Sequence, residues 1–73
     1  MEVDFYFKLE NRRVGIDAKH SDNLTESDVA GLLQFRTHLP DAYIGLFHFG
    51  TQVRKLGGVW CLPWQDGLKE LGL

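Results

Sequence analysis

The stretch that decides the fold is EVDFYFKLENRRVGIDAKH, which runs from Glu2 to His20. Apolar and polar residues alternate along it on both sides of an ENRR turn at residues 10–13. A period of two is typical of strands that bury one face. From Val3 to Leu9 the odd positions are apolar, and the returning strand directs inward Val14, Ile16 and Ala18. We therefore predict an antiparallel hairpin whose tight turn has Asn11 as the residue suited to a left-handed conformation.

The opposite face of the predicted hairpin gathers charged side chains. Asp17 and Lys19 share that face because they are two residues apart on one strand, and the turn brings Asp4 across from them. Carboxylate oxygens on adjacent strands, with the Ala18 carbonyl nearby, suit a hard cation such as Mg²⁺ or Mn²⁺. A lysine beside this ion can orient an attacking water and offset negative charge in the transition state. We expect these three side chains on one face, opposite the face that holds Val3, Phe5, Phe7 and Ile16.

An ordinary charged surface is the alternative for the same residues. Cross-strand Asp–Lys pairs are common on exposed hairpin faces and contribute little to stability. The three histidines and Cys61 do not change this choice, because their spacing matches no zinc-binding pattern. Spacing alone therefore leaves a metal site and a solvated surface both open.

The rest of the chain predicts a helix, two further strands and a terminal helix. Thr25 followed by Asp28 forms a variant of the capping box, and apolar residues then recur at helical spacing. Residues 42–49 (AYIGLFHF) are typical of a central strand covered on both faces, residues 59–64 (VWCLPW) are strand-like, and residues 64–71 form a short helix. The order strand-strand-helix-strand-strand-helix predicts an α/β (α+β) fold, a mixed sheet of about four strands with helices against it.

Composition limits the class of protein. The chain has 73 residues, which suffice for one domain with a thin core, and 44% of them are hydrophobic. A net charge of −2 argues against strong non-specific nucleic-acid binding, yet a metal-dependent nuclease is compatible with it because an acidic metal site lowers the average charge. A single cysteine, Cys61, fits a reducing compartment. With no apolar run of about 18 residues and no signal peptide, we expect a soluble, cytoplasmic protein without membrane contact.

Asp4 on a strand, then a hairpin, Asp17-x-Lys19, a helix and an apolar strand resemble the PD-(D/E)XK nuclease superfamily. EVDF, IDAK, the GLLQF helix and the late VWCLPW are most similar to the C-terminal domain of a large group of prokaryotic AAA-type ATPases, a PD-(D/E)XK-like domain without a settled activity. The resemblance implies that Asp4 and Asp17 are metal ligands and that Lys19 is the catalytic lysine. It also implies Mg²⁺ or Mn²⁺ as the cofactor of a phosphodiester hydrolase.

Two departures from the superfamily pattern affect the expected fold. Val3 stands where a proline usually precedes the first Asp. The superfamily core also begins with a helix and a strand upstream of the Asp strand, and that helix often adds a Glu to the metal site. Residues 1–73 therefore correspond to a restriction-endonuclease-like minimal core, which is either a C-terminal fragment of a longer protein or a version completed by a partner. Glu2 shares the face of Asp4 and is a candidate substitute ligand.

Two functions follow as expectations. The leading hypothesis is a Mg²⁺-dependent DNA nuclease with Asp4, Asp17 and Lys19 as catalytic residues. The alternative is a catalytically silent PD-(D/E)XK-like interaction or dimerisation module, accessory to an ATPase. Two pairs of basic residues are expected in turns, Arg12–Arg13 and Arg54–Lys55. Either the two pairs jointly bind a nucleic-acid backbone, or they are only solvated.

A homodimer through the strand Val3–Leu9 is also predicted. Relative to the superfamily, this strand lacks the elements that would flank it, and an unpaired edge beside exposed aromatic residues readily pairs with another chain. Lys8 is the only cation on this strand, so little positive charge protects the edge from pairing. If the terminal helix at residues 64–71 instead folds back over this edge, the protein stays monomeric.

Overall fold

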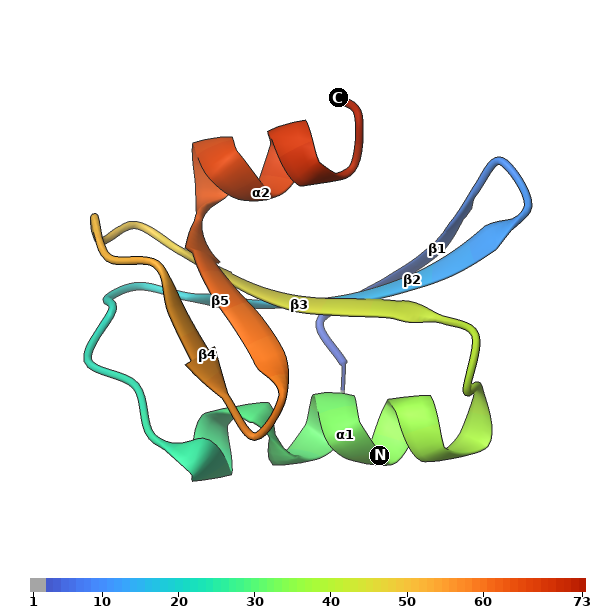
Figure 1. Ribbon diagram of the computed structural model, residues 1–73, viewed down its shortest axis with the longest axis horizontal. Helices are drawn as coiled ribbons and strands as arrows, with labels where there is room; N and C mark the ends of the chain where they lie inside the picture. Colours follow the sequence, from blue (N-terminus) through green and yellow to red (C-terminus); the bar gives the residue numbers. More distant parts are fainter. Residues whose placement is uncertain (1–2) are drawn as a thin grey trace.

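The computed structural model describes residues 3–73 and has three layers, with a mixed sheet between two helices (Figure 1). In this part of the chain the sheet has five strands in the spatial order β1-β2-β3-β5-β4. The strands are β1 (Phe5–Leu9), β2 (Arg12–Lys19), β3 (Tyr43–His48), β4 (Arg54–Leu56) and β5 (Val59–Pro63). Helix α1 (Ala30–His38), which follows a 3₁₀ turn (Glu26–Val29), lies on one face, and α2 (Trp64–Glu70) lies on the other. The predicted α+β class with a mixed sheet is confirmed.

The strand count differs from the prediction by one. β1 and β2 form the predicted antiparallel hairpin, and β2 continues through α1 into β3, which is parallel to it. β3 is in turn parallel to β5, and β5 pairs antiparallel with β4, the strand that the sequence did not reveal. β4 is only three residues long, RKL, so it is too short to display an alternation of apolar and polar residues. The turn that joins it to β5 has positive φ angles at Gly57 (56°) and Gly58 (84°).

Each face of the sheet has its own apolar cluster. On the α1 face, residues from the helix segment pack against the sheet: Leu24, Val29, Leu32, Phe35, Ile44, Leu46, Val59 and Cys61. On the α2 face the cluster is smaller: Val14, Ile16, Phe47, Leu62 and Leu71. β3 contributes to both clusters, as its almost wholly apolar sequence predicted.

The helical segment that leads into α1 begins at Thr25, where the sequence predicted a cap. The main-chain N–H of Thr25 donates a hydrogen bond to Asp28 Oδ2 at 2.8 Å, which completes the capping box. The first turn is 3₁₀ rather than α-helical, and the α-helix proper starts at Ala30. Gly15 of β2 lets this helix approach closely, because a Cβ atom there would lie 2.8 Å from the Phe35 ring.

Two details of the hairpin differ from the sequence expectation. The left-handed residue of the turn is Glu10, with φ 58°, and not Asn11. Val3 packs against the cluster on the α1 face, so it does not share a face with Phe5 and Phe7. The strand alternation begins only at Phe5, because the chain bends at Asp4 before it enters β1.

Candidate functional site

Asp4 and Asp17 meet at the start of β1. The main-chain N–H of Asp4 donates to Asp17 Oδ1 at 2.9 Å, and the main-chain N–H of Ala18 donates to Asp4 Oδ2 at 2.9 Å. Each carboxylate therefore binds the backbone of the other residue's strand. The antiparallel pairing of Phe5 with Ile16 places the two residues next to each other, as the hairpin register predicted.

Lys19 is directed to a different acidic residue. Its Nζ lies 3.7 Å from Asp28 Oδ1, in the 3₁₀ turn that precedes α1, and the two side chains are 43% and 26% exposed. A partly exposed pair at this distance is weak. Lys19, the last residue of β2, is thus directed towards the turn that precedes α1 and not towards the Asp4–Asp17 pair.

The face that carries Asp17 and Lys19 is not an open face. Both residues alternate with Val14 and Ile16, which pack on the α2 side, so they point to the α1 side together with Gly15. Helix α1 packs on this face through Phe35, so the face that carries these charges is covered by a helix and is not a solvated hairpin surface throughout. Asp17 is half-buried there. The sequence does not indicate this contact, because the residue that packs against the helix is Gly15, which has no apolar side chain.

Each carboxylate of the pair accepts one main-chain hydrogen bond. The N–H groups engage Asp17 Oδ1 and Asp4 Oδ2, and an ionised carboxylate has two oxygens that can accept hydrogen bonds or bind a cation. Within residues 3–73, no group of three or more His, Cys, Asp or Glu side chains could hold a metal ion. Glu2, the candidate substitute ligand, lies outside the described residues. Among the described residues, Asp4 and Asp17 could hold a hard cation as two carboxylates whose coordination is completed by water.

Asp22 is a structural residue that sequence reasoning missed. Its Oδ2 accepts the main-chain N–H groups of Thr51 at 3.2 Å and Gln52 at 3.4 Å, and these bonds lower the pKa of the Asp22 carboxyl below its ordinary value of 3.8. Arg54 Nη1 donates to the carbonyls of Asp22 and Leu24 at 3.3 and 3.2 Å. Ser21-Asp22-Asn23 are residue types common in turns, where Asp accepts nearby backbone N–H groups, and nothing in this sequence indicates partners 29 and 30 residues away.

His48 is the buried polar side chain of β3, with 1% of its surface exposed. Its Nδ1 accepts the main-chain N–H of Gly50 at 3.0 Å, so the proton of the neutral ring is on Nε2. Within residues 3–73, Nε2 is buried without a hydrogen-bond partner, so only one ring nitrogen of His48 is hydrogen-bonded there.

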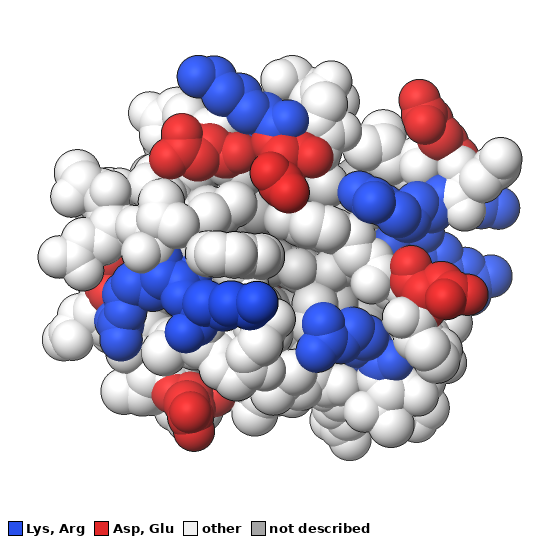
Figure 2. Space-filling view, viewed as in Figure 1, with Lys and Arg blue, Asp and Glu red and all other residues white. Residues whose placement is uncertain are grey.

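The predicted basic residues lie on two separate edges. Arg12 lies over the Tyr43 ring at 5.2 Å near the hairpin turn, whereas Lys55 lies over the Trp60 ring at 5.1 Å on β4, the opposite edge strand. Figure 2 shows Lys and Arg in several groups on the face in view, and acidic residues lie beside the upper and right-hand groups. These groups form no continuous basic stripe on that face of the kind that tracks a nucleic-acid backbone.

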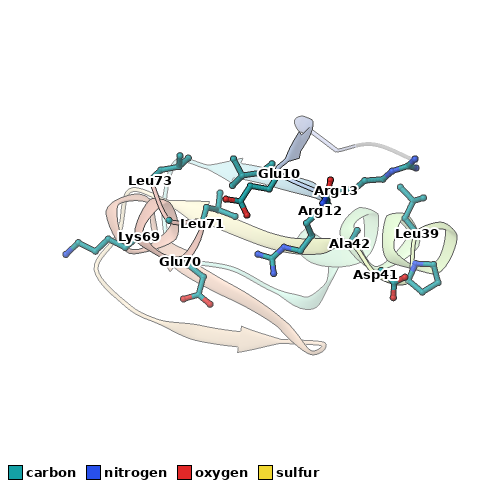
Figure 3. Close-up of a pocket in the computed structure, with 14 residues that line it drawn as sticks. Glu10, Arg12, Arg13, Leu39, Asp41, Ala42, Lys69, Glu70, Leu71 and Leu73 are labelled. Atoms are coloured by element: carbon teal, nitrogen blue, oxygen red, sulfur yellow. The ribbon is translucent and has the colours of Figure 1, made fainter.

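The surface of the described residues is hollowed near the hairpin turn. A concavity of about 1140 Å³ lies between the hairpin turn, the loop after α1 and the end of α2, and Arg12 extends into it towards Glu10 and Glu70 (Figure 3). Arg13 and Lys69 point away from it. Its lining includes three basic and three acidic residues, and so it has no uniform charge.

A second hollow, a groove of about 330 Å³, separates the hairpin from α2. Its lining is almost wholly apolar and includes Phe5, Phe7, Trp64, Leu68 and Leu73. It follows from the position of α2, which packs mainly on β3 and β5 and leaves the aromatic residues of β1 uncovered.

Comparison with protein-family models, curated proteins and solved structures finds no match to this chain. In the part of the chain that the structure describes, neither helix combines the length and the apolar character needed to cross a bilayer.

Proposed function

We propose that this domain is a PD-(D/E)XK-like interaction module that self-associates through β1 and does not cleave DNA. The proposal rests mainly on the exposure of β1. This strand forms an edge of the sheet, and three consecutive aromatic side chains on it are exposed, by 55% for Phe5, 56% for Tyr6 and 37% for Phe7. Exposed edges with apolar side chains pair with other chains unless charges or neighbouring elements protect them.

The role of Asp4 and Asp17 supports a silent module. Their reciprocal hydrogen bonds fasten the start of β1 to β2, so the two carboxylates have a structural task at the edge itself. Lys19 faces Asp28 in the turn before α1 and pairs only weakly with it. A structural role for the two carboxylates is compatible with a PD-(D/E)XK-like domain that does not catalyse.

The mass in solution tests the self-association. Light scattering at micromolar concentration should give twice the chain mass of 8.4 kDa. Lys8→Pro should return the protein to a monomer, because proline removes a main-chain donor from the edge and is incompatible with a regular ladder. A matched proline at Lys55, on the other edge strand, should leave the dimer intact. A wild-type protein that stays at 8.4 kDa contradicts the proposal.

A Mg²⁺- or Mn²⁺-dependent DNA nuclease is the second candidate function. It is favoured by one observation: the two carboxylates that the superfamily resemblance assigns to the metal lie side by side on neighbouring strands. Titration with Mn²⁺ followed by NMR should broaden the Asp4 and Asp17 resonances first if this candidate is right. Cleavage of plasmid, single-stranded or branched DNA that is lost in both Asp17→Asn and Lys19→Ala would replace the silent module with the nuclease.

A further inference from the structure

The pairing of β1 with a second copy can be specified residue by residue, given the self-association proposed above. In a continuous sheet, a two-fold axis perpendicular to the sheet relates two antiparallel edge strands. Directly opposed residues then point to the same face. On β1, Tyr6 contacts Phe35 on the α1 face, with ring centroids 5.3 Å apart, whereas Phe5 and Phe7 line the groove on the α2 face. Odd-numbered residues of β1 can therefore oppose only odd-numbered residues of the second copy, and even-numbered residues only even-numbered ones. The axis must then pass midway between one residue of β1 and the same residue of the second copy.

Charge decides among the positions that remain. An axis at Lys8 would place Lys8 against its own copy, and an axis at Phe7 would place Asp4 against Glu10 of the second copy. Like charges directly opposite each other destabilise a strand pair. An axis at Phe5 would place Val3 opposite Phe7, although Val3 packs on the α1 face. An axis at Leu9 would extend the pairing into the turn at Glu10, where φ is positive and the strand ends.

An axis at Tyr6 removes each of these conflicts. It places Asp4 opposite Lys8 of the second copy, twice in the dimer, and it places Phe5 opposite Phe7 of that copy. Within residues 3–73, Lys8 forms no ion pair in its own chain, so its ammonium group is available to the second copy. Asp4 is held at the strand start by the hydrogen bonds with Ala18 and Asp17, which fixes the position of its charge.

We propose that two copies of this chain pair antiparallel through β1 with Tyr6 on the two-fold axis, and that Asp4–Lys8 pairs between the copies set this register. The two five-stranded sheets become one continuous sheet. Phe5 and Phe7 of both copies form an aromatic cluster on the α2 face, where the two apolar grooves meet.

Disulfide trapping reads this register directly. Opposed residues in antiparallel strands have Cα atoms about 4.5–5.5 Å apart, which suits a disulfide. Tyr6→Cys should therefore give a covalent dimer under mild oxidation, and Phe7→Cys should not, because it opposes Phe5 of the second copy. Cys61 will not compete, because it is fully buried and burial raises the pKa of its thiol above the ordinary value of 9.0.

Charge reversal gives an independent measurement if Tyr6→Cys folds poorly. Lys8→Glu should raise the dimer Kd about tenfold, since it turns two attractive pairs into repulsive ones. Lys55→Glu on the opposite edge strand should leave Kd unchanged.

The outcomes separate the register from the proposed function. A wild-type dimer with trapping at Tyr6 supports both. A wild-type dimer that is trapped at Phe7→Cys and not at Tyr6→Cys, or that tolerates Lys8→Glu, refutes the register and leaves the self-associating module standing. A wild-type monomer refutes the module itself.

Discussion

The reciprocal hydrogen bonds between Asp4 and Asp17 predict that removing either carboxylate destabilises the metal-free protein. In Asp17→Ala the main-chain N–H of Asp4 loses its acceptor, and the bend that leads into β1 loses its attachment to β2. In Asp4→Ala the main-chain N–H of Ala18 loses its acceptor in the same way. A metal centre predicts the opposite sign, because two carboxylates that share a site without metal repel each other.

The magnitude follows from the geometry. A hydrogen bond contributes about 0.5–1.5 kcal/mol to stability, and more where one partner is ionised. Both bonds here are 2.9 Å long but exposed, so water partly replaces a lost acceptor. We expect Asp17→Ala to lower the free energy of unfolding by about 1 kcal/mol, which corresponds to a Tm decrease of about 4–8 °C in a domain of this size.

Asparagine provides the matched control. Asp17→Asn keeps an oxygen at the Oδ1 position and loses only the charge, so it should cost less than about 0.5 kcal/mol. In the double variant Asp4→Ala/Asp17→Ala, the cost should be smaller than the sum of the single costs, because either substitution already releases the segment that both bonds hold.

Urea unfolding in EDTA measures all four variants under one condition. An Asp17→Ala protein that is as stable as the wild type, or more stable, would show that these hydrogen bonds do not fasten β1. That result would restore the metal centre as the better explanation of the carboxylate pair.

Three further substitutions probe other parts of the structure. Gly67→Ala should lower Tm by about 4–8 °C by thermal denaturation, because its Cβ would lie 2.6 Å from the Phe47 ring and overpacking there exceeds the helix-propensity gain of about 1 kcal/mol. Lys19→Ala should change the free energy of unfolding by less than about 0.5 kcal/mol in urea, since its pair with Asp28 is long and partly exposed. Asp22→Asn should be less stable than the wild type at neutral pH. Because the folded Asp22 pKa is depressed, its stabilisation is present above the unfolded value of 3.8 and is lost as the pH falls through the lower folded value, so the two proteins should converge in stability at strongly acidic pH.

The sequence predicted the elements whose local signals agree with their tertiary environment. The hairpin follows from period-two alternation, and its register brings Asp4 next to Asp17. The start of the helical segment follows from Thr25 and Asp28, whose side chains form the capping box. The central strand β3 follows from its apolar run, because only a strand covered on both faces can bury such a run.

The features that sequence reasoning missed depend on contacts between distant residues. β4 exists only because its three residues pair with β5. The helix on the charged face of β2 was concealed by Gly15, which carries no side chain to signal burial. Lys19 was assigned to the carboxylates of the hairpin, whereas its ion pair is with Asp28, nine residues further along the chain. Spacing within a hairpin fixes which residues share a face but not which of several acids a long side chain reaches.

The exposure of β1 accompanies the position of α2 over β3 and β5. Gly67 lies against the Phe47 ring, so α2 can seat closely over β3 and β5. The helix lies away from the hairpin, and Phe5 and Phe7 are among the residues that line the groove of about 330 Å³ between them. A helix displaced towards the hairpin would cover these aromatic residues but would leave Phe47 and Leu62 exposed instead. One seven-residue helix cannot cover the whole face of a five-stranded sheet, so the fold leaves apolar surface for a second chain wherever the helix lies. Here the uncovered apolar surface lies on β1, an edge strand of the sheet. The outer edge of such a strand also offers main-chain N–H and C=O groups for pairing, and we therefore expect self-association through β1.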